Sequence, residues 1–158
     1  MSITESEKKK RRSGIPTGNA GEYFVMGELL RRGYDAQLAD RNTKGYDLLV
    51  GRPGDGRDMR RVQVKTVRGG PWYVRVAAYT DLADQVTVYV IIGKEDCRTP
   101  VRYFIARNGD VAVHVTQPNS PKWTANGFVN LLAVKDFENK WELLDALPAP
   151  RRARTSRR

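Results

Sequence analysis

Three polar residues that could do chemistry lie in two short apolar segments of this sequence. Asp47 interrupts the segment 46–50, and Gln63 and Lys65 alternate with valines in the segment 61–66. Side chains of a strand alternate between its two faces, so Gln63 and Lys65 share one face. An acid, an amide and an amine can therefore meet on one face of a sheet. Isolated charges are costly to bury, so such a group indicates either paired charges or a bound metal ion.

The two segments that carry these residues are predicted to form a β-hairpin. Both have branched apolar residues at alternating positions, which is typical of strands with a buried face. Between them, residues 51–58 include three glycines and one proline, a composition that favours a turn.

A second carboxylate is expected on a helix upstream of the hairpin. Thr17-Gly18-Asn19 can cap a helix that continues to about Arg32 and ends at Gly33. Glu22 then lies in the middle of an apolar stripe, whose other members are Val25, Met26, Leu29 and Leu30. In that position Glu22 faces the core. The alternative is that Glu22 merely complements the dipole of the helix start.

The order of these motifs resembles the PD-(D/E)xK nuclease superfamily. The motifs are Gly21-Glu22 on a helix, Gly45-Tyr46-Asp47 on a strand, and Val62-Gln63-Val64-Lys65-Thr66 on the next strand, within residues 17–70. This superfamily, which includes archaeal Holliday-junction resolvases and some intron-encoded homing endonucleases, has the restriction-endonuclease-like fold. The resemblance implies an α/β domain with a central mixed β-sheet flanked by helices.

The resemblance also implies a metal-dependent endonuclease that hydrolyses DNA phosphodiester bonds. Mg²⁺, with Mn²⁺ as a substitute, would be held by Glu22, Asp47, the Gln63 side-chain oxygen and the Val64 backbone carbonyl. Lys65 would assist the attacking water, so the implied catalytic residues are Glu22, Asp47, Gln63 and Lys65. One departure matters, because the superfamily pattern has Glu or Asp where this chain has Gln63. Glutamine offers a neutral oxygen and lowers the charge of the site by one, which makes Glu22 more important.

The net charge of +10 comes from the two ends of the chain. Apart from ten basic residues near the ends, the remaining 18 basic residues balance the 18 acidic ones. We expect these ends to be disordered in isolation and to contact phosphates; the alternative is that they only improve solubility. The ten residues are Lys8, Lys9, Lys10, Arg11, Arg12, Arg151, Arg152, Arg154, Arg157 and Arg158.

Length and composition predict one domain with two arms. The expected division is a basic N-terminal arm over 1–16, the nuclease-like domain over 17–147 and a basic tail over 148–158. No apolar run has the length of a membrane span, and the N-terminus is charged, so a cytoplasmic, nucleoid-associated protein without a membrane partner is expected. One cysteine and one histidine exclude an intrachain disulfide and a structural zinc site built on these residues.

Further strands are expected over 34–38, 72–76, 85–92, 102–106 and 111–115, the last two joined by an Asn108-Gly109 turn. A closing helix is expected from Asp136 to Leu147, with Trp141 and Leu144 on its buried side.

Four residues of the central region are candidate nucleic-acid contacts. Lys44 lies in the polar loop before Asp47, and the other three, Arg68, Tyr73 and Arg75, lie in and beside the 72–76 strand. Aromatic and arginine side chains together suit stacking on bases and ion pairing with phosphates. The alternative is a solvated loop and a polar outer face of a hairpin.

Three functions remain open from the residues. The first is an endonuclease acting on duplex or branched DNA, for which a homodimer is compatible because many nucleases of this fold pair to cut two strands. The second is a non-catalytic nucleic-acid-binding protein of the same fold, favoured by Gln63. The third is an assembly subunit whose polar strand residues form a buried ion-pair network.

Overall fold

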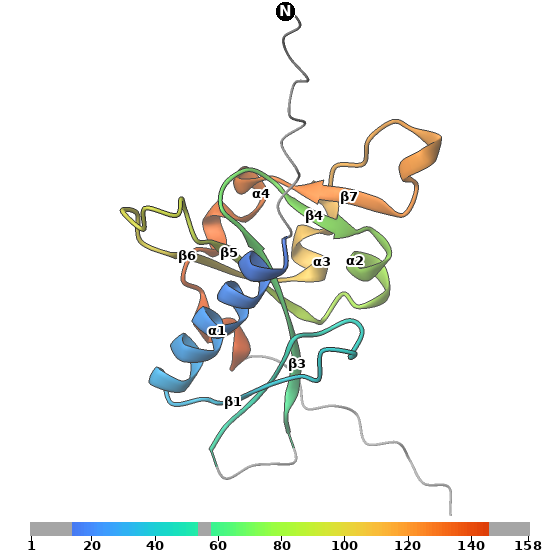
Figure 1. The fold of residues 1–158 in the computed structure, drawn as a ribbon. Helices are drawn as coiled ribbons and strands as arrows, with labels where there is room; N and C mark the ends of the chain where they lie inside the picture. Colours follow the sequence, from blue (N-terminus) through green and yellow to red (C-terminus); the bar gives the residue numbers. More distant parts are fainter. Residues whose placement is uncertain (1–13, 54–57, 146–158) are drawn as a thin grey trace, which may run out of the picture.

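A mixed five-stranded sheet forms the centre of the computed structural model, which describes residues 14–53 and 58–145. Within that part of the chain the strand order is β1-β2-β3-β5-β6, and only β3 and β5 are parallel (Figure 1). The predicted fold class, a central mixed sheet flanked by helices, is confirmed. The strands are β1 (Asp35–Leu38), β2 (Leu48–Gly51), β3 (Arg60–Val67), β5 (Val86–Ile91) and β6 (Arg102–Arg107).

The long helix α1 (Ile15–Arg31) covers one face of this sheet. Its buried Val25 and Leu29 pack against Val62 and Val64 of β3 and the alternate residues of the neighbouring strands. Because side chains alternate along β3, Gln63 and Lys65 lie on the opposite face. Among the described residues, no helix combines the length and the apolar character of a membrane span.

A second, two-stranded sheet covers the opposite face, together with short helices. β4 (Trp72–Arg75) pairs with β7 (Asn126–Val129), and both lie toward the upper right in Figure 1, near α2 (Ala77–Asp81) and α3 (Asn108–Val111). Trp72 packs edge-on against Tyr89 and Phe104, with ring centroids 5.3 and 6.0 Å away. The remaining short elements are η1 (Ala112–His114), η2 (Pro121–Trp123), α4 (Leu131–Val134), η3 (Lys135–Phe137) and η4 (Trp141–Leu144).

Helix α1 begins earlier than the sequence predicted. Its N-cap is Gly14, and Gly18 N–H donates to the Gly14 carbonyl at 3.0 Å, so the predicted cap at residues 17–19 is wrong. Pro16 suits the first turn because its missing N–H would have no partner there. The predicted end is confirmed, since Gly33 has φ +85°, a left-handed conformation that glycine adopts without strain. Leu30 is not buried as predicted; its exposed fraction is 49%.

The predicted hairpin between residues 46 and 66 is confirmed as the antiparallel pair β2–β3. β2 begins at Leu48, so Tyr46 and Asp47 precede the strand rather than belonging to it. Tyr46 instead lies beneath the Arg61 guanidinium, 5.0 Å from the ring centroid.

The predicted strand over 111–115 and its Asn108-Gly109 hairpin turn are wrong. Residues 108–111 form α3 and residues 112–114 a 3₁₀ turn. The reason is the buried Asn108 side chain, which donates to the carbonyls of Ala78 and Leu82 and accepts from the Thr87 hydroxyl at 2.7 Å. These bonds hold the chain against α2 after β6, where a hairpin turn would have needed a solvated asparagine.

The predicted closing helix is replaced by two 3₁₀ turns, η3 and η4. Asn139 has φ +55° between them, which interrupts helical geometry. Trp141 and Leu144 are buried, as predicted.

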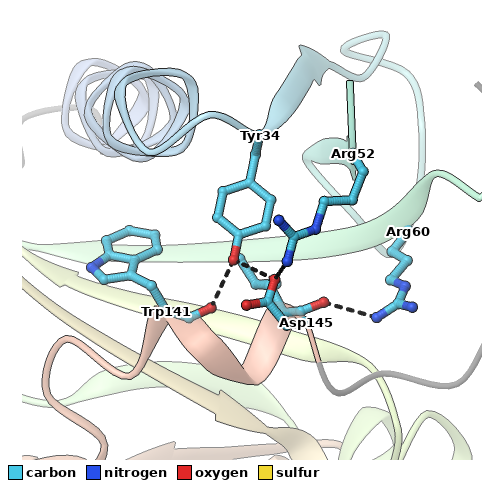
Figure 2. A network of polar contacts seen from close by, with 6 residues as sticks. Tyr34, Arg52, Arg60, Trp141 and Asp145 are labelled. Atoms are coloured by element: carbon cyan, nitrogen blue, oxygen red, sulfur yellow. Dashed lines mark hydrogen bonds and ion pairs between the residues drawn. The ribbon is translucent and has the colours of Figure 1, made fainter. Parts of the chain in front are cut away.

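Asp145 holds the end of η4 against the sheet, as Figure 2 shows. Its carboxylate accepts from the Tyr34 hydroxyl at 2.7 Å and pairs with Arg52, while Arg60 donates to the Leu144 carbonyl at 2.8 Å. These contacts tie the C-terminal end of the described chain to β3 and to the residues that adjoin β1 and β2.

Candidate metal and nucleic-acid site

The candidate site begins where β2 separates from β3. The two strands pair only as far as Leu48 and Val62, while β3 continues to Val67. Asp47 is the last residue in contact, since its N–H donates to the Val62 carbonyl at 2.9 Å. The next β3 amide on this side, Val64 N–H, donates to the Asp47 carboxylate at 2.8 Å. A carboxylate thus occupies the place of the missing strand neighbour.

Gln63 closes one side of this gap. Its side-chain amide donates to the same carboxylate oxygen of Asp47, and lies 3.4 Å from the Val64 carbonyl oxygen. The N–H and C=O of one strand residue point the same way, so the Val64 carbonyl also faces the gap. The structure therefore brings the predicted ligand residues Asp47, Gln63 and Val64 together, with the nitrogen of the Gln63 amide, rather than its oxygen, toward the acid.

Glu22 reaches the same region from α1. The helix lies close against β3 at Gly21, where an added Cβ would lie 2.7 Å from both Cβ and Cγ2 of Thr66. Burial raises the pKa of Glu22, and the negative charge of Asp47 raises that pKa further, while Arg41 opposes the shift. The two carboxylates are thus close enough to repel each other.

Asp47 and Lys65 interact electrostatically. Burial raises the pKa of Asp47; the Val64 N–H hydrogen bond and the positive charge of Lys65 act in the opposite direction. Lys65 is half-buried on the same face of β3 as Gln63. The structure therefore brings together an acid pair, an amide and an amine, contributed by α1, the β2 edge and β3.

This donor set fits a hard divalent cation. Carboxylate, amide and carbonyl oxygens suit Mg²⁺, which proteins hold through one or two carboxylates, with water and substrate oxygens completing the shell. Oδ1 of Asp47 accepts no hydrogen bond from the described residues, which leaves it for a ligand. Residues 14–53 and 58–145 contain no cluster of three or more His, Cys, Asp or Glu side chains, so the site rests on two carboxylates. For Gln63 to contribute its oxygen, the side-chain amide must turn over.

The candidate nucleic-acid contacts within the described chain are all exposed. Lys44 lies in the loop before Asp47, and Gln85 holds that loop by donating to the Gly45 carbonyl at 2.7 Å. Arg68 donates to the Gly93 carbonyl at 3.2 Å. Tyr73 and Arg75 project from the outer face of β4. The predicted contacts at 8–12, 151 and 152 lie outside the described residues.

Sequence reasoning missed three contributors to this site. The Arg41 charge acts on Glu22, and Gln85 fixes the loop before Asp47; neither carried a signal in the sequence. The Gly21–Thr66 approach did carry one. Gly21 stands four and eight residues before Val25 and Leu29, at the spacing of the buried side of α1. A glycine there indicates close packing against the sheet.

Comparisons with known proteins give two similar solved structures. No family model matches this sequence, and no curated protein matches it. The chain is similar to Hjc from Archaeoglobus fulgidus, a Holliday junction resolvase from an archaeal hyperthermophile, at 15% identity and a TM-score of 0.46, covering 75% of this chain and 87% of that one.

It is also similar to the bacterial homing endonuclease I-Ssp6803I, at 15% identity and a TM-score of 0.49, covering 84% of this chain and 91% of that one. A Holliday junction resolvase and a homing endonuclease are also the kinds of nuclease that the motifs resemble. At 15% identity these likenesses concern the fold alone.

Proposed function

We propose that this chain is a divalent-metal-dependent endonuclease that hydrolyses phosphodiester bonds of DNA. The observation that carries the proposal is the approach of Glu22 to Asp47 in the gap beside β3, where the negative charge of Asp47 raises the pKa of Glu22 and Lys65 lies close by. Two repelling, half-buried carboxylates are costly unless a cation neutralises them.

The residues of the site would have distinct roles. Glu22 and Asp47 would hold Mg²⁺ or Mn²⁺ through carboxylate oxygens, with the Gln63 and Val64 oxygens beside them. The bound ion would lower the pKa of a water molecule and offset charge on the phosphate. Lys65 would orient the attacking water and offset negative charge on the phosphate oxygens. The Val64 N–H keeps the Asp47 carboxylate in place while these groups act.

A second function is favoured by one contact. The Gln63 amide donates to Asp47, so it satisfies that carboxylate without a cation. A chain that relied on this arrangement would bind DNA through its exposed basic residues and would not cut it. The same DNA partner is proposed in both cases, and for the endonuclease a homodimer would supply a second site for the other strand.

Cleavage of supercoiled plasmid and of a four-way junction separates these functions. We expect cutting in Mg²⁺ and Mn²⁺, none in EDTA, and loss of cutting in Asp47→Asn and Lys65→Ala, both with unchanged DNA retention in a gel. Asp47→Asn keeps an oxygen for the Val64 N–H, so it tests charge rather than folding. The exposed Asp84→Asn and Lys94→Ala are matched controls. Retention of DNA without cutting in any metal would reject the endonuclease and favour the binding protein.

A further inference from the structure

The outer face of the β4–β7 sheet presents an aromatic and a cationic side chain side by side. Trp72 and Val74 of β4 are buried, so Tyr73 and Arg75 share the opposite, outward face. Tyr73 is 77% exposed, although tyrosine usually buries most of its ring. Across the ladder Tyr73 pairs with Phe128 and Arg75 with Asn126. We call these four residues the β4–β7 platform.

The platform side chains of β4 have no partner in the described chain. Tyr73 makes no hydrogen bond or ring contact there, and Arg75 makes no ion pair. By contrast, the exposed Arg32, Arg52 and Arg102 pair with carboxylates. An exposed aromatic side chain alone is ordinary on a protein surface. Here Arg75, two residues along on the same face, adds a positive charge that no carboxylate of the described chain neutralises.

Basic and acidic residues both flank the platform in the sequence. The segments 68–80 and 111–135 include Arg68, Arg75, Lys122 and Lys135, and Asp81, Asp110 and Asp136 lie directly beside these segments. The charge on the platform that complements an anionic backbone is therefore that of Arg75 itself.

The strand that carries the platform is anchored to the central sheet near the end of β3. The Trp72 indole N–H donates to the Val90 carbonyl at 3.1 Å, and Val90 pairs with Thr66, the residue after Lys65. The small sheet is thereby held over the end of β3 that carries Lys65. In Figure 1 the N-terminal end of α1 lies toward the same end of the molecule as β4 and β7.

We propose that the β4–β7 platform binds an unpaired nucleotide, with its base stacked on Tyr73 and its phosphate paired with Arg75. Bases within a duplex are stacked on each other and hide their faces, so an exposed aromatic ring selects a base that has left the stack. Resting on the proposed function, this means that the site acts on DNA in which a single-stranded segment adjoins a duplex. Phe128 would widen the apolar surface beneath the base.

Fluorescence anisotropy in EDTA tests the proposal without cleavage. The full chain is titrated with a labelled single strand, the blunt duplex of the same sequence, and that duplex with an unpaired extension. We expect Tyr73→Leu to weaken binding of the single strand and the extended duplex by about 5- to 100-fold, as loss of one stacked base does, and to change blunt-duplex binding less than about twofold. Tyr73→Phe, which keeps the ring, should bind like the wild type.

Arg75→Ala tests the phosphate contact by salt dependence. For the single strand, the slope of log affinity against log salt concentration should become shallower by about one unit in Arg75→Ala, because one phosphate contact is lost. The exposed Arg98→Ala should keep the wild-type slope. Unchanged single-strand affinity in Tyr73→Leu, or an equal loss on the blunt duplex, would overturn the platform. That outcome would favour a protein partner or a plain surface. If the protein does not cleave DNA but Tyr73→Leu still weakens binding of the single strand and not of the blunt duplex, the endonuclease is rejected and the nucleotide-binding platform is retained.

Discussion

The Asp47 carboxylate accepts the Val64 backbone N–H at 2.8 Å, at the point where β3 has lost β2 as its neighbour. One side chain thus satisfies a backbone donor and places a negative charge in the gap between two strands. The same residue is structural and, in the proposed function, a cation ligand.

Substitutions of Asp47 should separate these two roles. Asp47→Ala leaves the Val64 N–H without its acceptor, so its free energy of unfolding in EDTA should be about 1–3 kcal/mol below that of Asp47→Asn. Neither variant should gain stability from Mg²⁺, whereas the wild type should, because a ligand that binds only the folded state stabilises it. Urea unfolding with and without Mg²⁺ measures both effects. Equal stability of the two variants would show that the hydrogen bond contributes nothing.

Gln63→Glu should lower the stability of the protein without divalent cation and raise its affinity for the cation. The variant replaces the amide that donates to Asp47 with a third carboxylate, so without divalent cation at pH 7 unfolding should become easier by about 1–3 kcal/mol. Mg²⁺ should then stabilise the variant more than the wild type, because the site has one more negative charge. Thermal melts at increasing Mg²⁺ give the two responses, with the exposed Gln37→Glu as control. A cation site would be contradicted if the variant were less stable than the wild type at every Mg²⁺ concentration and if Mg²⁺ stabilised it no more than it stabilises the wild type.

Gly21 and Thr66 should be energetically coupled. Gly21→Ala would push α1 away from β3, at a cost of about 1–3 kcal/mol, and would move Glu22 with the helix. Thr66→Gly removes the obstructing side chain, so the double variant should be more stable than the sum of the single changes by about 1 kcal/mol. Denaturation of all four proteins provides the cycle. Additive effects would mean that the contact at Gly21 does not set the position of α1.

Tyr34 should ionise late and should couple stability to alkaline pH. Burial and then the Asp145 hydrogen bond raise the pKa of Tyr34 to about 12 (Figure 2). A raised pKa in the folded state means that the contribution of Tyr34 to stability is complete below pH 10, the ordinary tyrosine value, and is lost as pH rises toward 12. The free energy of unfolding should therefore decline less steeply above pH 9 in Tyr34→Phe than in the wild type.

Asp145→Asn supplies the second arm of that test. Removal of the negative charge should lower the pKa of Tyr34 toward 10. The absorbance of ionised tyrosine, measured as a function of pH and compared with that of Tyr34→Phe, would detect this change. An unchanged ionisation in Asp145→Asn would leave burial as the whole cause.

Local patterns were sufficient for the elements that carry the proposed chemistry. Alternation placed Gln63 and Lys65 on one face of a strand, and Gly33 ended the helix that carries Glu22. The patterns failed where a single buried contact changed the local conformation. Asn108 reads as a turn residue, but its side chain bonds to α2 and β5, and a helical turn replaces the expected hairpin.

The sequence by itself determined the strands of the central sheet and the set of polar residues, because alternation and glycine positions depend only on neighbours along the chain. The mixed arrangement of that sheet was implied by the resemblance of the motifs. Tertiary structure decided what those residues meet. It brought Glu22 close to Asp47 through the packing of Gly21 on Thr66, and it turned the Gln63 amide toward the acid. It also left Tyr73 and Arg75 outside while Trp72 anchored their strand. Distances between elements remote in sequence follow from the shape of the packed core, which no local pattern encodes.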